Sequence, residues 1–283
     1  MLDHSLLDEI ILDDFYTELR RIEGKSAAYY HWHQCLELLY VESGVGLVVV
    51  DNNHYTLKPG RLFIFPKGKL HKIQVENTEK NIYKRTVIHI NDVVILPYLK
   101  LFNHLSEKFK LLSSSQKASI YTLDTQDQQY INLLLHYFTQ KYSNNSQDYA
   151  SIALLFLNII DLIADDFTYQ HHKISSISSK IMQYVEDNFK EKITLKDIAA
   201  HNNISEAYTS RIFKQETGGT LQEYIIVRRV KYACYLLTET DHSIAEIAVL
   251  SGFRYTTYFI KCFNKVIGST PLIYRKKNIV SIS

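Results

Sequence analysis

Two short motifs in the N-terminal half of the chain carry side chains that can bind a divalent metal ion. His31, His33 and Glu37 lie close together in the sequence, and His71 follows in a second motif. If residues 31–37 are extended, the three side chains of the first motif leave the same face, because side chains alternate along a strand. Neutral imidazoles and a carboxylate form metal sites with open coordination positions. The alternative is that the four side chains hydrogen-bond to one another, to water or to an organic ligand.

The stretch around these motifs is predicted to form short antiparallel strands. Residues 15–91 contain alternating or β-branched runs, such as 63–65 and 82–90. Turn-forming residues separate the runs at 43–44, 51–53, 58–60 and 66–68. Many short strands at regular spacing favour a barrel or a jelly roll.

The last predicted strand adds two candidate ligand-binding residues. Tyr83 and Arg85 share a face with His89, because positions of one parity point the same way. If that face is the lumen of the barrel, Arg85 can contact an anionic or polyhydroxylated ligand. The alternative is an ordinary surface arginine. Trp32 has the opposite parity to His31 and His33, so we expect it to face away from them.

Together the two motifs resemble those of the cupin fold. They are His31-x-His33-x3-Glu37-x6-Gly44 and Gly60-x5-Pro66-x-Gly68-x2-His71. The resemblance implies a small double-stranded β-helix barrel in which the three histidines and the glutamate converge. Two departures are Val75, where the second motif usually ends in Asn, and one extra residue between Gly24 and His31.

Helical periodicity replaces the strand pattern in the middle of the chain. Apolar residues recur every three or four positions over 99–109 and 131–138, and residues 152–160 are apolar on nearly every side. This helical segment, 93–170, either caps the barrel or carries the interface of a homodimer, and we expect the latter. Residues 171–179 are polar and rich in serine, so we expect them to link two domains.

The C-terminal half contains one pattern twice. Thr194–Asp197 and Ser243–Glu246 are each a hydroxyl followed three residues on by a carboxylate, which is the capping box that begins a helix. The two copies are offset by 49 residues (243 − 194) up to a turn and by 50 after it. A short helix, a tight turn and a longer helix form the helix-turn-helix motif, whose second helix enters the DNA major groove. We therefore expect two DNA-reading helices, joined by a continuous helix over 221–238.

Each predicted reading helix has an apolar inner face and a polar outer face. Arg211 and Lys261 can bind guanine O6 and N7, and Ile260 can contact a thymine methyl group. Lys214, Arg254 and Lys265 are expected at phosphates, which position a protein on DNA without specifying sequence. The residues expected to contact DNA are Ser205, Glu206, Ala207, Tyr208, Ser210, Arg211, Lys214, Arg254, Tyr255, Thr256, Thr257, Ile260, Lys261 and Lys265.

Charge and cysteine content agree with nucleic-acid binding by one half of the chain. Residues 174–283 hold 15 Lys and Arg against 10 Asp and Glu, a balance of +5, and residues 1–173 hold 17 against 20, a balance of −3. The three cysteines have no framework spacing, which favours a reducing cytoplasm. We find neither a signal peptide nor an apolar run of about 18 residues, so we expect a soluble protein that acts in the cytoplasm at the nucleoid, away from membranes.

The duplicated half resembles the AraC/XylS family of bacterial transcription regulators over residues 175–277. The resemblance is carried by Ile198-Ala199, Arg211-Ile-Phe213-Lys, Gly218, Tyr224, Arg229, Ala233, Leu236-Leu237, Ile244-Ala-Glu-Ile-Ala248, Gly252-Phe253, Tyr258-Phe259, Phe263, Gly268-x-Thr270-Pro271 and Tyr274-Arg275. It implies a factor that responds to a small molecule, binds double-stranded promoter DNA, most often activates RNA polymerase and is often a dimer. Departures are Thr209, Lys261 and Arg254-Tyr255, which bear on base preference.

The predicted fold is therefore two-domain α+β, with an N-terminal cupin-like barrel flanked by helices and an all-α C-terminal domain. The expected division is a barrel over 1–92, helices over 93–170, a linker over 171–179 and a double helix-turn-helix over 180–277. The favoured function is a DNA-binding regulator, an activator, controlled by a small molecule such as a sugar at His31, His33, Glu37, His71, Tyr83 and Arg85. No cofactor is required, although the first four residues can hold a divalent metal. The alternatives are a metal-dependent cupin enzyme fused to a DNA-binding domain and a DNA-architectural protein with a purely structural barrel.

Overall fold

Two β-sheets form the N-terminal domain. The computed structural model describes residues 17–24, 29–50, 52–76, 78–115, 117–142, 148–163 and 176–279. The larger sheet has the order β1-β7-β2-β5-β8 and the smaller has the order β4-β3-β6. All the strand pairs are antiparallel. The strands are β1 (Glu18–Glu23), β2 (Leu36–Ser43), β3 (Gly46–Val50), β4 (Asn53–Leu57), β5 (Arg61–Phe65), β6 (His71–Gln74), β7 (Lys84–Ile90) and β8 (Ser119–Thr122).

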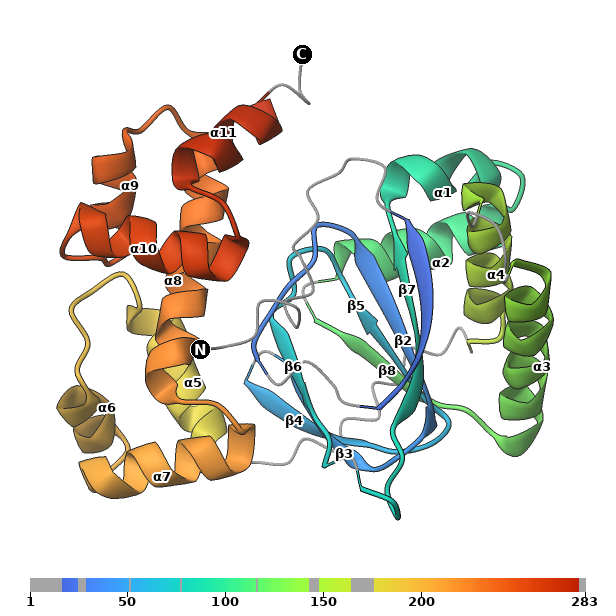
Figure 1. The fold of residues 1–283 in the computed structure, drawn as a ribbon, viewed down its shortest axis with the longest axis horizontal. Coiled ribbons are helices and arrows are strands. Elements are labelled where there is room, and N and C mark those ends of the chain that lie inside the picture. Colours follow the sequence, from blue (N-terminus) through green and yellow to red (C-terminus); the bar gives the residue numbers. More distant parts are fainter. Residues whose placement is uncertain are drawn as a thin grey trace.

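The two sheets enclose an apolar core, as the cupin-like pattern predicts (Figure 1). Alternate residues of β2, such as Leu39 and Val41, pack there with Val48 and Val50 of β3 and Phe63 of β5. The other parity of β2, which includes Leu38 and Tyr40, packs outward under the helices. Both faces of the sheet are therefore buried at its central strands β2 and β5, which explains why these two strands are apolar at most positions.

Four helices cover the outer face of the larger sheet (Figure 1). Leu155, Phe156 and Ile159 lie among the buried residues between helices and sheet. The segment 93–170, for which we predicted helices, also contains β8, which extends the larger sheet by pairing with β5. Four residues are too few to show a strand period, so the sequence pattern missed this strand. The helices are α1 (Asp92–Leu99), α2 (Asn103–Ser114), α3 (Thr125–Tyr142) and α4 (Tyr149–Asp161).

The C-terminal domain is entirely helical. Helix α8 runs between two helix pairs, α6–α7 and α9–α10, and packs against α7, α9, α10 and α11. The expected linker over 171–179 lies outside the described residues up to 175, and its last three residues already belong to α5, which Ser176 caps. The helices are α5 (Ile177–Asn188), α6 (Leu195–His201), α7 (Glu206–Thr217), α8 (Leu221–Glu239), α9 (Ile244–Leu250), α10 (Thr256–Ile267) and α11 (Pro271–Ile279).

The predicted duplication is present in detail. Both expected capping boxes form, at the starts of α6 and α9. The turns match as well, because Asn203 and Gly252, which are 49 residues apart, both adopt positive φ angles of 55° and 84°. The cap of α7 is Ser205 and the cap of α10 is Tyr255, which are 50 residues apart. The extra residue therefore lies between the turn and α10. None of the helices in the described part of the chain is long and apolar enough to span a membrane.

Candidate functional sites

The four predicted ligand residues meet at one end of the barrel, between the two sheets. Glu37 comes from β2 of the larger sheet and His71 begins β6 of the smaller one. His31 and His33 lie on the segment before β2, and a β-bridge joins His31 to His71. All four side chains are buried. The alternation of side chains along the chain therefore placed these residues correctly on one face.

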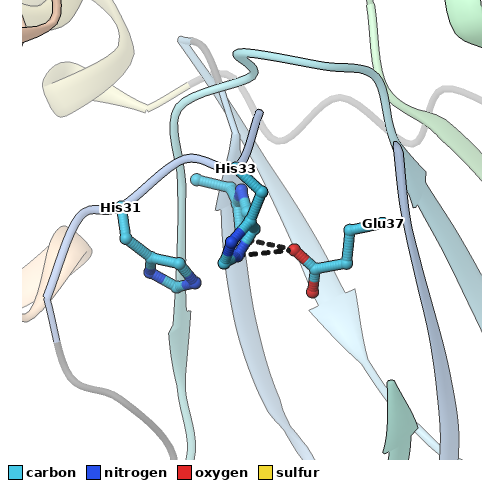
Figure 2. Close-up of side chains that lie close together, drawn as sticks. His31, His33 and Glu37 are labelled. Carbon is cyan, nitrogen blue, oxygen red and sulfur yellow. Dashed lines mark ion pairs between the residues drawn. The ribbon is translucent and has the colours of Figure 1, made fainter. Parts of the chain in front are cut away.

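Two ion pairs of this cluster meet at the carboxylate of Glu37 (Figure 2). Its Oε2 atom lies 3.0 Å from His33 Nε2 and 3.1 Å from His71 Nε2. One potential ligand atom from each of His31, His33, Glu37 and His71 lies within 4.8 Å of the others. Metal–ligand distances of about 2.0–2.2 Å place two ligands of one ion at most about 4.4 Å apart. Binding of one ion by all four residues therefore requires the most widely separated of these atoms to move closer together.

Backbone carbonyl groups orient two of the imidazole rings. His31 Nδ1 lies 3.1 Å from the carbonyl oxygen of Tyr29, and His71 Nδ1 lies 2.9 Å from that of Lys69. If each Nδ1 donates to its carbonyl, the Nε2 lone pair of each ring points into the cluster. This is the arrangement by which proteins fix the tautomer of a metal-binding histidine.

The electrostatics of the cluster favour a neutral His31 and an ionised Glu37. Burial lowers the pKa of His31 well below its ordinary value, and the neighbouring rings of His71 and His33 lower it further. Burial opposes ionisation of Glu37, but His71 and His33 outweigh it and hold the pKa of this carboxyl well below its usual range. A neutral imidazole and an ionised carboxylate are the forms in which these two groups bind a divalent cation.

His89 adjoins the cluster, whereas Tyr83 and Arg85 lie further along the same strand. His89 pairs with Glu37 in the sheet, and its Nε2 atom is 3.8 Å from Glu37 Oε2. Sequence parity alone does not place His89 among the ligand residues, and its position opposite Glu37 in the sheet is the signal that adds it. Arg85 is four residues, or roughly 13 Å, from His89 along the strand. Its guanidinium lies 4.7 Å from the centre of the Tyr83 ring, and both side chains are buried.

The first reading helix, α7, presents the predicted outer face to solvent. Ser210, Arg211 and Lys214 are exposed, whereas Thr209 and Phe213 are fully buried. The Arg211 guanidinium lies 5.3 Å from the centre of the Tyr208 ring, which holds the cation at the surface. Glu206 and Ala207 are exposed in the first turn. These residues form one continuous polar surface at the start of the helix, as insertion into a major groove requires.

The second reading helix, α10, has the same partition with different residues. Thr257, Lys261 and Lys265 are exposed and Thr256 is half-buried, while Phe259 and Phe263 pack inside. Ile260 is 36% exposed on the outer face, as expected for a residue that can contact a thymine methyl group. The preceding Arg254 and Tyr255 are exposed and stack at 5.2 Å. The two helices therefore present different side chains to DNA, so one chain is expected to recognise an asymmetric sequence.

Helix α8 sets the spacing between the two reading helices. It contains 19 residues, which correspond to about 28 Å. Successive major grooves on one face of DNA repeat at about 34 Å. A rigid helix of this length can hold two readers one helical turn of DNA apart. A capping box begins α8 at Thr220, directly after the left-handed Gly218 that ends α7.

Comparison with family models assigns both halves of the chain. Residues 15–180 match an AraC-like ligand binding domain, and residues 198–277 match a helix-turn-helix domain. The first match alone spans more than half of the chain, and it ends within helix α5.

Three curated proteins illustrate the similarity. The chain is 24% identical to the "Uncharacterized HTH-type transcriptional regulator YfiF" of Bacillus subtilis, over 97% of this chain and 91% of that protein. It is also 24% identical to the HTH-type transcriptional activator RhaR of Mannheimia succiniciproducens, over 88% and 87%. The melibiose operon regulatory protein of Escherichia coli is 33% identical over a shorter stretch, 35% of this chain and 32% of that protein.

Proposed function

The chain belongs to the AraC family of helix-turn-helix transcription regulators, and on this premise we propose that it activates promoters under the control of a small molecule bound in its barrel. It is a DNA-binding regulator with an AraC-like ligand binding domain. The activating role rests on the relative RhaR, which is described as a transcriptional activator. The observation that carries the DNA-binding role is the repeated partition of α7 and α10, in which the same helical positions face outward in both copies.

We further propose that the cluster of His31, His33, Glu37 and His71 holds a divalent cation. Glu37 Oε2 and His71 Nε2 are buried and face each other 3.1 Å apart. If His71 carries its proton on Nδ1, these two atoms are facing acceptors that repel each other, and a buried polar atom without a partner costs about 1–3 kcal/mol. A cation between them satisfies both atoms and offers open coordination positions to hydroxyl or carboxylate groups of an effector.

The effector is proposed to bind in the barrel near this cluster. The melibiose operon regulator among the relatives makes sugars the first class to test. Sugar hydroxyl groups suit a metal with open positions. Arg85 and Tyr83, further along β7, are proposed to bind a second polar part of the ligand, because guanidinium groups form paired hydrogen bonds with anions. We propose a sensing rather than a catalytic role for the barrel, since the relatives named above are transcription regulators.

A homodimer and RNA polymerase complete the proposed partners. Three exposed apolar residues form one stripe on α3, namely Tyr130, Leu133 and Tyr137. Their spacing of three and four residues places them on a single face of the helix. We propose that a second copy of the chain covers this stripe, so that two asymmetric readers bind one promoter in the cytoplasm. We propose that the promoter-bound protein contacts RNA polymerase, because activation of transcription requires it to act on the polymerase.

Sequencing of the genomic DNA that the protein binds tests the regulatory function. We expect recovery of a small set of promoters that share a directional sequence, and footprints that cover two major-groove turns per chain. Genes beside these promoters name effector candidates, which are then assayed by the shift in melting temperature that they cause. Binding spread evenly over the genome, without a shared sequence, would contradict a specific regulator.

A further inference from the structure

The two segments that carry the histidines of the cluster also form the surface on which the C-terminal domain docks. His31, His33 and His71 point into the barrel. The residues between and beside them point the opposite way, because side chains alternate along extended segments. Tyr30, Trp32 and Leu70 belong to the same hydrophobic cluster as the cores of the two helix-turn-helix units. One side of these segments therefore lines the proposed cation site, and the other side contacts the DNA-binding domain.

The contacts across this interface are close and specific. The Tyr30 ring packs edge-on against Tyr224 of α8, with 5.0 Å between ring centres, and its hydroxyl lies 3.9 Å from Met182 Sδ of α5. Lys72 is buried, and its Nζ atom lies 5.5 Å from the centre of the Tyr30 ring. A Cβ atom on Gly219, in the α7–α8 loop, would lie 3.0 Å from Lys72 Nζ. The loop after the first reading helix is thus seated directly behind the histidine cluster.

The backbone connects the two sides. The His31 amide donates to the His71 carbonyl at 3.0 Å, and the His71 amide donates to the His31 carbonyl at 2.9 Å. This bridge, together with a hydrogen bond of 2.8 Å from the Gly68 amide to the His33 carbonyl, holds the two segments together. A cation bound by His31, His33, Glu37 and His71 would fasten both segments to each other and to β2. The docking surface formed by Tyr30, Trp32, Leu70 and Lys72 would then be held in one position.

We infer that cation binding in the cluster and docking of the DNA-binding domain on the barrel strengthen each other. This inference rests on the proposed cation site and adds its regulation. A ligand shifts a conformational equilibrium only through its different affinity for the two states, and the coupling is reciprocal. The docked form must therefore bind the cation more tightly than the undocked form. The ratio of these two affinities equals the factor by which the bound cation shifts the docking equilibrium.

Docking leaves the DNA-contacting face of the first reader free. The interface involves the α7–α8 loop and the start of α8, whereas Ser210, Arg211 and Lys214 remain exposed. The contact thus fixes the orientation of the reader relative to the barrel without covering its outer face. In a dimer formed through the barrels, that orientation determines whether the readers of both chains reach their DNA sites together.

A matched pair of substitutions tests the coupling. Gly219→Val places a side chain against Lys72 and Tyr30, at a position with an ordinary negative φ angle outside both the cation cluster and the reading faces. Ser269→Val is the control, because Ser269 occupies the equivalent loop position of the second repeat, 50 residues on. Trp32 is the only tryptophan of the chain and is 1% exposed at the interface, so its fluorescence and its quenching by acrylamide report docking.

Zinc is the probe, because it is redox-inactive and accepts histidine and carboxylate ligands. We expect Gly219→Val to expose Trp32 and to weaken zinc binding by the full-length protein about tenfold, within the usual range of allosteric coupling. Excess zinc should then shield Trp32 again, and Ser269→Val should leave both quantities unchanged. If Gly219→Val does not fold, Gly219→Ser introduces the residue that the second loop already carries.

Three results would overturn the inference. The first is an exposed Trp32 with unchanged zinc affinity, which shows that docking and binding are independent. The second is a Trp32 that stays exposed in Gly219→Val when zinc is in excess, which shows that zinc does not favour docking. The third is an equal loss of zinc affinity in Gly219→Val and Ser269→Val. Failure of the proposed cation site gives a different result, because the wild-type protein would then bind no zinc at all.

Discussion

Glu37 Oε2 and His71 Nε2 lie 3.1 Å apart in the interior of the barrel, where both side chains are buried. The two residues come from opposite sheets, β2 and β6. His71 Nδ1 lies 2.9 Å from the carbonyl oxygen of Lys69, and if the ring carries its proton only there, the Nε2 lone pair faces the carboxylate. Polar atoms are rarely left in this state inside proteins, and such a pair calls for a proton or a cation between them. A cation at this contact would take the place of the proton, which is the basis of the site proposed above.

The substitution Glu37→Gln is expected to weaken zinc binding by roughly a hundredfold. Structural zinc sites contribute about 10–16 kcal/mol, or about 3 kcal/mol for each of four ligands. The amide removes the only negative charge among the proposed ligands but keeps the shape of the side chain. Competition with a chelator measures the affinity, and Glu76→Gln, at an exposed carboxylate, is the control. Equal zinc affinity of wild type and Glu37→Gln would remove Glu37 from the site.

The substitution Arg211→Ala is expected to weaken specific DNA binding by about 1–3 kcal/mol and to relax base selectivity at one position of the site. Arg211 is exposed on the outer face of α7 and is held beside Tyr208. Binding measured against a library of single-base variants of the site reveals which position loses selectivity. The assignment fails if affinity and base preference both remain those of the wild type.

Lys214→Ala is expected to behave differently from Arg211→Ala. Lys214 lies one turn further along α7, where it can reach a phosphate. Its removal should reduce affinity for all DNA sequences alike and lower the slope of affinity against salt concentration by about 1. Titrations at several salt concentrations, on a specific and a random duplex, measure this slope. A loss confined to the specific duplex would instead mean that Lys214 contacts a base.

Local signals made the double helix-turn-helix predictable. Capping boxes, turn residues and helical periodicity each involve neighbours in the sequence, so Thr194–Asp197 and Ser243–Glu246 identified both repeats. Side-chain alternation likewise predicted that His31, His33 and Glu37 would share a face and that Trp32 would lie opposite them. The family matches confirm the resemblance inferred from these residues.

Features that depend on distant partners could not be predicted in this way. Strand β8 exists because β5 offers it an edge, and its four residues carry no pattern of their own. The role of Tyr30 and Lys72 depends on docking of a domain that begins more than a hundred residues later along the chain. The burial of His54 could not be predicted for the same reason, since its partners Ser176 and Ser178 lie at the start of α5.

The docked arrangement is expected to weaken as the pH falls below about 6.5. His54 is buried on β4, with Ser176 Oγ 3.1 Å from Nδ1 and Ser178 Oγ 3.1 Å from Nε2. Burial lowers the pKa of His54, and Glu216 offsets this only in part. The undocked form therefore binds the proton more readily, so docking is strongest at higher pH and is lost as His54 becomes charged. The shielding of Trp32 from acrylamide, measured between pH 8 and 5, reports this loss of docking. The substitution His54→Gln should make the shielding less dependent on pH. An identical pH profile in both proteins would exclude His54 as the cause.

Leu133→Asp is expected to convert the proposed dimer into monomers. Leu133 is 65% exposed at the centre of the α3 stripe, between Tyr130 and Tyr137. A buried carboxylate without a partner is strongly unfavourable in an apolar interface, whereas in a monomer it would be solvated. Analytical ultracentrifugation over a range of concentrations measures the association. The control is Leu101→Asp, which places the same charge at a more exposed leucine between α1 and α2 and should leave the dimer intact. If Leu133→Asp sediments as the wild type does, the subunits associate through another surface.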